Sequence, residues 1–108
     1  MTASAQQIWQ KFVALPGSTV DGGVGIASQN AIGGLIRLLN SRSPKRILEI
    51  GAGIGTLTYT ILDLARSTGM NRNPDFTFYS VENNEYCLGQ LANNLSGFEG
   101  TYRVIPSV

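Results

Sequence analysis

Residues 46–57 join a short apolar run to three alternate glycines and then to the start of a helical pattern. The run Arg46–Ile50 stops at Gly51, and its composition is typical of a strand that is buried on both faces of a parallel sheet. Apolar residues then recur at helical spacing over Thr56–Thr68, and Gly69 stands where a left-handed helix cap is expected. This order predicts the first half of a β-α-β unit.

The same alternation continues to the end of the chain. We expect a helix from residue 28 or 29 to 40, a turn over residues 41–45, a second strand over residues 76–81 and a third strand over residues 102–105. Helical spacing returns between the last two strands, with Asn83 or Asn84 as its cap. Strands that alternate with helices in this way predict the α/β class, with right-handed crossovers and a parallel sheet.

The first 27 residues are expected to form a separate amino-terminal part, followed by the β-α-β-α-β part at residues 28–108. Ser4 and Gln7 have the spacing of a capping box, which opens a short helix. A glycine-rich loop follows over residues 18–27, and its glycines either lie against a ligand or only form a turn. The helix is expected to bury one apolar side, made of Ile8, Trp9, Phe12 and Val13.

Composition excludes several classes of protein. The 108 residues suffice for one small domain or part of a larger one, and 8 basic against 7 acidic residues give no broad field for nucleic acid or anionic lipid. No apolar run approaches the roughly 20 residues that span a bilayer, and no signal-peptide pattern is present, so we expect a cytoplasmic protein. With no histidine and a single cysteine, Cys87, no metal site is expected, and Cys87 is expected in the core.

Residues 49–56 are the part of the sequence that points to a bound ligand. They read E-x-G-x-G-x-G-T, so a ligand can approach the backbone closely and meet the unpaired N–H groups of a helix amino terminus. Glu82 ends the next strand and should reach the same edge, where a carboxylate can accept hydrogen bonds from a ribose diol. Thr56 replaces the third glycine of a dinucleotide motif, and no P-loop occurs. A nucleoside-like ligand is predicted; the alternative is a tight turn without a ligand.

These residues resemble the first motif of the class I S-adenosylmethionine-dependent methyltransferases, in which a strand ends in Asp or Glu followed by G-x-G-x-G. The resemblance implies a Rossmann-like sheet with its three strands in the order 3-2-1, and S-adenosylmethionine as the cofactor. It implies that Glu49 lies near the amino-acid end of the cofactor and that Glu82 binds the ribose. Asn83 then either contacts the adenosine or caps the helix. The loop that would pack under the cofactor comprises Gly51, Ala52, Gly53 and Gly55.

The implied activity is methyl transfer to an acceptor, for which a small molecule is the first expectation. The motif is also similar to that of ribosomal RNA adenine dimethylases, although the charge balance does not support RNA. Only three strands are expected, so the sheet of a complete methyltransferase would need a further segment or a partner chain. No catalytic residue is named, because family residues that contact the acceptor follow later strands. The alternatives are an aminopropyltransferase, an NAD-dependent enzyme and a non-catalytic module for assembly.

Overall fold

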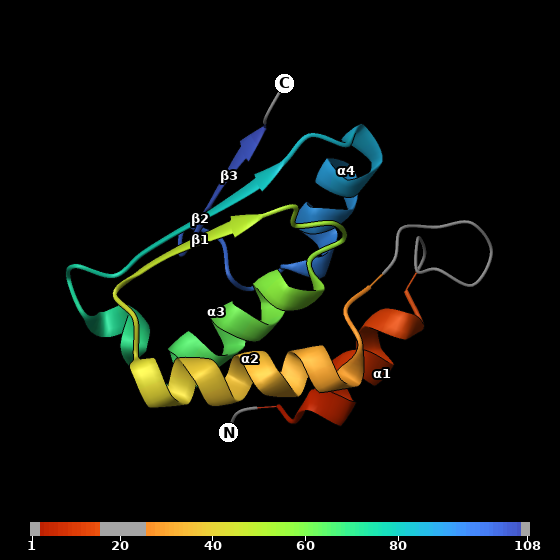
Figure 1. The fold of residues 1–108 in the computed structure, drawn as a ribbon. Helices are drawn as coiled ribbons and strands as arrows, with labels where there is room; N and C mark the ends of the chain where they lie inside the picture. Colours follow the sequence, from red (N-terminus) through yellow and green to blue (C-terminus); the bar gives the residue numbers. More distant parts are fainter. Residues whose placement is uncertain (1–2, 16–25, 107–108) are drawn as a thin grey trace.

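The computed structural model describes residues 3–15 and 26–106. Its three strands are parallel and form one sheet with β2 in the centre, so the predicted α/β class and the strand order 3-2-1 are confirmed (Figure 1). The strands are β1 (Arg46–Ile50), β2 (Thr77–Glu82) and β3 (Arg103–Pro106). The helices are α1 (Ala5–Val13), α2 (Gln29–Arg42), α3 (Thr56–Thr68), the 3₁₀ turn η2 (Met70–Arg72) and α4 (Glu85–Asn94).

Most element boundaries lie within two residues of the predicted ones. α3 has the predicted bounds, and Gly69 caps it with φ 80°. α2 continues to Arg42 instead of ending at residue 40, because the chain leaves the helix only at Ser43, which has φ 43° and donates its N–H to the Leu39 carbonyl at 2.8 Å. The predicted turn over residues 41–45 is therefore shorter. β2 and β3 each begin one residue later than predicted.

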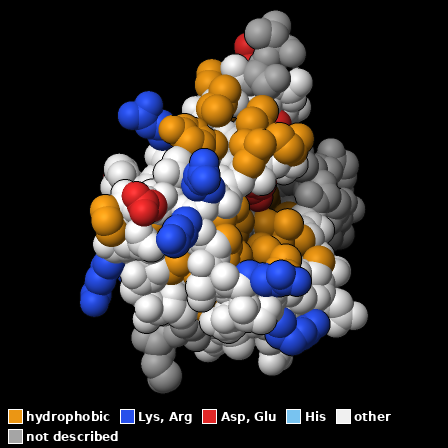
Figure 2. All heavy atoms as spheres, turned by 60° about the vertical axis from the view of Figure 1, so that its left-hand side comes forward, with side chains coloured by type: hydrophobic (Ala, Val, Ile, Leu, Met, Phe, Trp, Pro, Cys, Tyr) orange, Lys and Arg blue, Asp and Glu red, His pale blue; other side chains and the backbone are white. Residues whose placement is uncertain are grey.

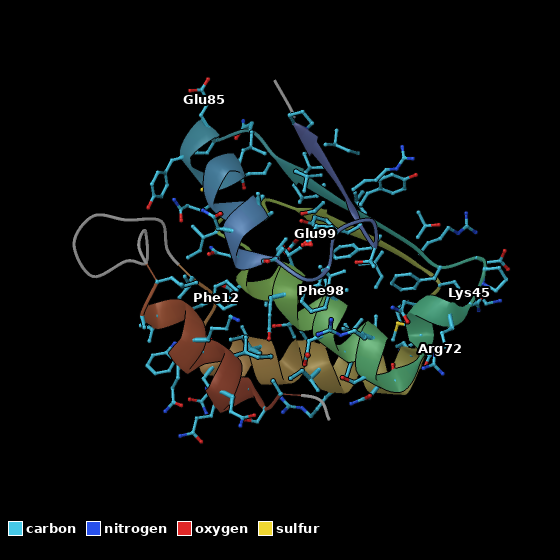
Figure 3. The ribbon with its side chains drawn as sticks, turned by 180° about the vertical axis from the view of Figure 1, so that it is seen from behind. Phe12, Lys45, Arg72, Glu85, Phe98 and Glu99 are labelled. Atoms are coloured by element: carbon cyan, nitrogen blue, oxygen red, sulfur yellow. The ribbon has the colours of Figure 1, made fainter. Side chains whose placement is uncertain are left out.

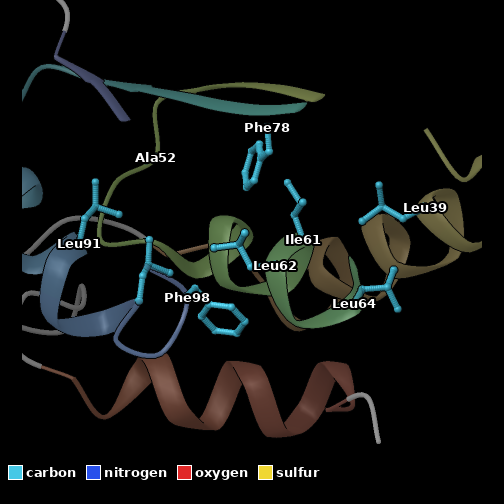
Figure 4. Close-up of a cluster of buried hydrophobic side chains, with 9 residues drawn as sticks. Leu39, Ala52, Ile61, Leu62, Leu64, Phe78, Leu91 and Phe98 are labelled. Carbon is cyan, nitrogen blue, oxygen red and sulfur yellow. The ribbon is translucent and has the colours of Figure 1, made fainter. Parts of the chain in front are cut away.

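All the described helices lie on one side of the sheet, and α1 lies beyond α2 and α3 on the side away from the strands (Figure 1). Phe78 points from β2 toward Ile61 and Leu62 of α3, and Leu91 of α4 joins the same cluster (Figure 4). This cluster of buried side chains is the main core; it consists of Leu39, Ala52, Ile61, Leu62, Leu64, Phe78, Leu91, Leu95 and Phe98.

The opposite face of the sheet is open. Leu48 is 63% exposed and Ile50 is 74% exposed, because no element of the described residues covers this side. The prediction that β1 is buried on both faces is therefore wrong. The strand is apolar enough for burial on both sides, yet only one of its faces is covered here.

α1 packs on α2 and α3 and forms a second core cluster. The predicted capping box is present, since Ser4 and Gln7 exchange side-chain to backbone hydrogen bonds. Ile8 and Phe12 are buried, as the helical spacing predicted, whereas Trp9 and Val13 are only partly buried. Figure 3 labels Phe12 near the carboxyl end of α1. Residues 16–25, which include most of the glycine-rich loop, lie outside the described residues. Among the described helices, none has the length and hydropathy to cross a membrane.

Candidate functional site

The loop between β1 and α3 turns through three glycines in the left-handed region. Gly51, Gly53 and Gly55 have φ of 82°, 59° and 102°, a region that costs other residues roughly 1–2 kcal/mol. The N–H groups of Gly51 and Ala52 both donate to the Val81 carbonyl, at 2.8 and 3.1 Å. These bonds hold the loop beside the carboxyl end of β2.

The surroundings of these glycines differ. A Cβ atom on Gly55 would lie 3.0 Å from Cδ2 of Leu91, so packing against α4 requires glycine there. A Cβ atom on Gly51 would meet no atom within 4 Å, so this glycine borders open space. Ala52 is 6% exposed and its methyl group belongs to the main core, which leaves only its backbone for a ligand.

Glu82 links the end of β2 to the glycine loop. Its Oε1 accepts a hydrogen bond from the Gly53 N–H at 2.7 Å, and its Oε2 accepts from the N–H groups of Asn83 and Asn84 at 3.1 and 2.9 Å. A carboxylate has about four acceptor positions, so three backbone donors leave it with one to spare. The structure thus brings together Glu82 and the loop that the sequence predicted to meet at this edge.

Glu49 is turned toward the helical layer. Its Oε1 accepts hydrogen bonds from the hydroxyl groups of Thr58 and Ser80. Burial raises the pKa of the Glu49 carboxyl, the two hydroxyl donors lower it, and the negative charge of Glu82 raises it further. Glu49 therefore ties β1 to both α3 and β2 beneath the loop, a role that the motif alone did not reveal.

The amino terminus of α3 has no side-chain cap. Gly55 stands at the cap position, and the Tyr59 N–H is the donor that closes the first helical turn onto the Gly55 carbonyl at 2.7 Å. The three preceding N–H groups cannot bond within the helix. Thr56 is 4% exposed, and its buried Oγ1 has no hydrogen-bond partner among the described residues. Unpaired donors at a helix amino terminus favour a ligand that carries acceptor oxygens.

One neighbour of the loop, Asn94, was not predicted from the sequence. Asn94 of α4 donates its side-chain N–H to the Ile54 carbonyl at 2.8 Å, and Ile54 itself is buried in the second cluster, whose members are Ile8, Phe12, Ile32, Ile54 and Cys87. The only signal for Asn94 was its position beside the apolar stripe of a predicted helix.

Asn84, and not Asn83, caps α4, because its side chain accepts from the Cys87 N–H at 3.0 Å. The side chain of Asn83 is left exposed beside Glu82, so of its two predicted roles the capping one is wrong. Cys87 is buried as expected, and burial together with the charge of Glu82 raises its pKa, which keeps it a thiol. The described residues hold no group of three side chains that could bind a metal ion.

No protein-family model and no curated protein matches this chain. Its fold is similar to two solved structures of putative methyltransferases. The caffeoyl-CoA O-methyltransferase from Staphylococcus aureus has a TM-score of 0.71 at 21% identity, over 98% of this chain and 44% of that one. The RNA methyltransferase from Pyrococcus horikoshii has a TM-score of 0.66 at 21% identity, over 94% of this chain and 50% of that one. The chain thus spans about half the length of these proteins, and over that half it has the methyltransferase fold.

Proposed function

We propose that the carboxyl edge of this sheet binds S-adenosylmethionine and that the chain is the cofactor-binding part of a methyltransferase. The observation that carries the proposal is the hydrogen bond from the Gly53 N–H to Glu82, which joins the left-handed loop to an acidic strand end. In parallel α/β sheets ligands bind at this edge. The fold shared with two methyltransferases supports the same assignment.

The residues at this edge suit the cofactor. The open space beside Gly51 admits a group close to the backbone, and the remaining acceptor position of Glu82 can take a ribose hydroxyl. The uncapped end of α3 offers backbone N–H donors to a carboxylate. When bound, the cofactor supplies a methyl group on a positively charged sulfur. The part of this chain is to bind and orient it, and alignment is most of what direct methyl transfer needs.

For the acceptor we propose a small molecule. One structural neighbour is described as acting on caffeoyl-CoA and the other on RNA, so the fold itself does not choose between them. A formal charge of +1 gives this chain little attraction for a phosphate backbone. The groups that contact the acceptor are expected in the half of the fold that this chain does not match.

Calorimetric titration with S-adenosylmethionine, and separately with NAD, tests the proposal. The Gly51→Ala variant places a methyl group in the space assigned to the cofactor and should weaken S-adenosylmethionine binding at least tenfold. Gly100→Ala is its matched control, because Gly100 has nearly the same φ, 81° against 82°, an equally open Cβ position, and lies in the turn before β3. Both variants should lose a similar free energy of unfolding, about 1–2 kcal/mol.

The comparison separates the site from backbone strain. A loss of affinity in Gly51→Ala with none in Gly100→Ala supports a ligand beside Gly51. The proposed site would be contradicted if both variants bound S-adenosylmethionine with equal affinity, or if the chain bound NAD in place of S-adenosylmethionine.

A further inference from the structure

The open face of the sheet has a clear composition. Side chains alternate along each strand, and the registers Leu48↔Tyr79↔Arg103 and Arg46↔Thr77 place these residues on one face. The apolar members are well exposed: Leu48 63%, Ile50 74%, Tyr79 36% and Ile105 44%. A hollow of about 300 Å³ lies among Arg46, Ile47, Leu48, Thr77, Tyr79 and Ile105.

This exposure is too large for a surface that stays in water. Parallel sheets are covered by helices on both faces, and here the helices lie on one side only. Contiguous exposed apolar side chains mark an interaction site. About half of the length of each structural neighbour has no counterpart in this chain.

The charges on this face identify the kind of partner. Arg46 and Arg103 are both exposed on it, whereas the carboxylates of Glu49 and Glu82 lie on the covered side with Ser80. On the side of the molecule that is turned forward in Figure 2, Lys and Arg side chains lie among exposed hydrophobic side chains. A second copy of the chain would offer these arginines no partner, because the strand residues on this face include no Asp or Glu. A helix with carboxylates beside its apolar stripe would pair with both arginines.

We propose that this face, defined by Arg46, Leu48, Ile50, Tyr79, Arg103 and Ile105, is the docking surface for an amphipathic polypeptide helix whose apolar stripe is flanked by Asp or Glu. The apolar side chains supply affinity, and the two arginines select the acidic flank. This inference does not depend on the cofactor site, and its test reads peptide binding only.

Two synthetic 18-residue helical peptides serve as probes, with identical leucine stripes flanked by Glu in one and by Lys in the other. In calorimetry the folded 108-residue chain should bind the Glu peptide at least tenfold more tightly. Leu48→Asp should weaken that binding at least tenfold. Leu38→Asp is the matched control, because Leu38 is also exposed, 54%, but lies on α2 in the other layer. Arg46→Glu, a surface change that leaves the core intact, should abolish the preference for the Glu peptide.

Several outcomes would overturn the proposal. One is that the chain binds both peptides equally, or binds neither. Another is that Leu48→Asp and Leu38→Asp lose the same affinity for the Glu peptide. A third is that sedimentation shows a dimer which Leu48→Asp dissociates. Binding of a 12-nucleotide oligouridylate that Arg46→Glu abolishes would assign the face to nucleic acid instead.

Discussion

Glu49 and Glu82 are carboxylates at the ends of neighbouring strands, but their hydrogen bonds give them different roles. Glu82 accepts from three backbone N–H groups and holds the glycine loop to β2. Glu49 accepts from two side-chain hydroxyls and lies beneath the loop, where burial raises its pKa. Glu82 therefore fixes the backbone of the loop, whereas Glu49 links β1 to α3 and β2 through side chains.

The raised pKa of Glu49 gives a pH dependence of stability. The folded state holds the proton of Glu49 more tightly than the unfolded chain does. The contribution of Glu49 to the free energy of unfolding is therefore full below the ordinary glutamate pKa. It is lost as the pH rises through the raised pKa of the folded state. We expect Glu49→Gln to remove this loss and to be more stable than the wild-type chain at pH 7. Urea unfolding between pH 4 and 7 measures it; an unchanged slope of stability against pH in the variant would refute the assignment to Glu49.

At the scale of elements, local sequence located the helices and strands, because caps and turns depend on neighbouring residues. The capping box of Ser4 and Gln7 and the Gly69 cap after α3 were predicted from such local patterns. The meeting of Gly53 with Glu82, 29 residues apart, followed from the topology of a parallel sheet. The contact of Asn94 with Ile54, 40 residues apart, did not, because no local pattern specifies which side chain of a helix faces a loop. The open face of β1 was unpredictable for a related reason, since burial depends on which elements cover the strand.

Asn94 connects α4 to the glycine loop, so removal of its side chain should affect both the stability of the fold and the position of the loop. We expect Asn94→Ala to lower the free energy of unfolding by about 1 kcal/mol, the usual net value of a hydrogen bond. It should also weaken S-adenosylmethionine binding, because the Ile54 carbonyl would lose its donor. Asn93→Ala makes the same change of residue type at the exposed preceding position. If the two variants bind the cofactor equally well, Asn94 does not position the loop.

At the scale of the whole molecule, the amino-terminal helix and the glycine loop share one cluster of buried side chains. Phe12 is fully buried and contacts the ring of Tyr59 edge to face, with ring centroids 5.6 Å apart. Ile54 of the loop belongs to the same cluster. The Ala3 N–H also donates to Asp63 of α3 at 3.0 Å. α1 is therefore an integral part of the fold that supports the loop.

Unfolding should accordingly be a single transition. Trp9, the only tryptophan, lies on α1, so its fluorescence and the circular dichroism of the whole backbone should give the same urea midpoint. Phe12→Leu should lower both midpoints together, at a cost of about 1–2 kcal/mol. A fluorescence transition that precedes the loss of circular dichroism would show that α1 unfolds independently.

The common direction of the three strands also decides where a reporter can be attached. All carboxyl ends lie at the proposed ligand edge, so Pro106 is beside it, while Lys45 lies just before the opposite end of β1 (Figure 1). A strand of this length separates the two edges by about 20 Å. Because the natural cysteine, Cys87, is buried, a thiol dye would react selectively with a cysteine introduced at position 106 or 45. The first dye would sense a ligand directly, and the second would be its internal reference.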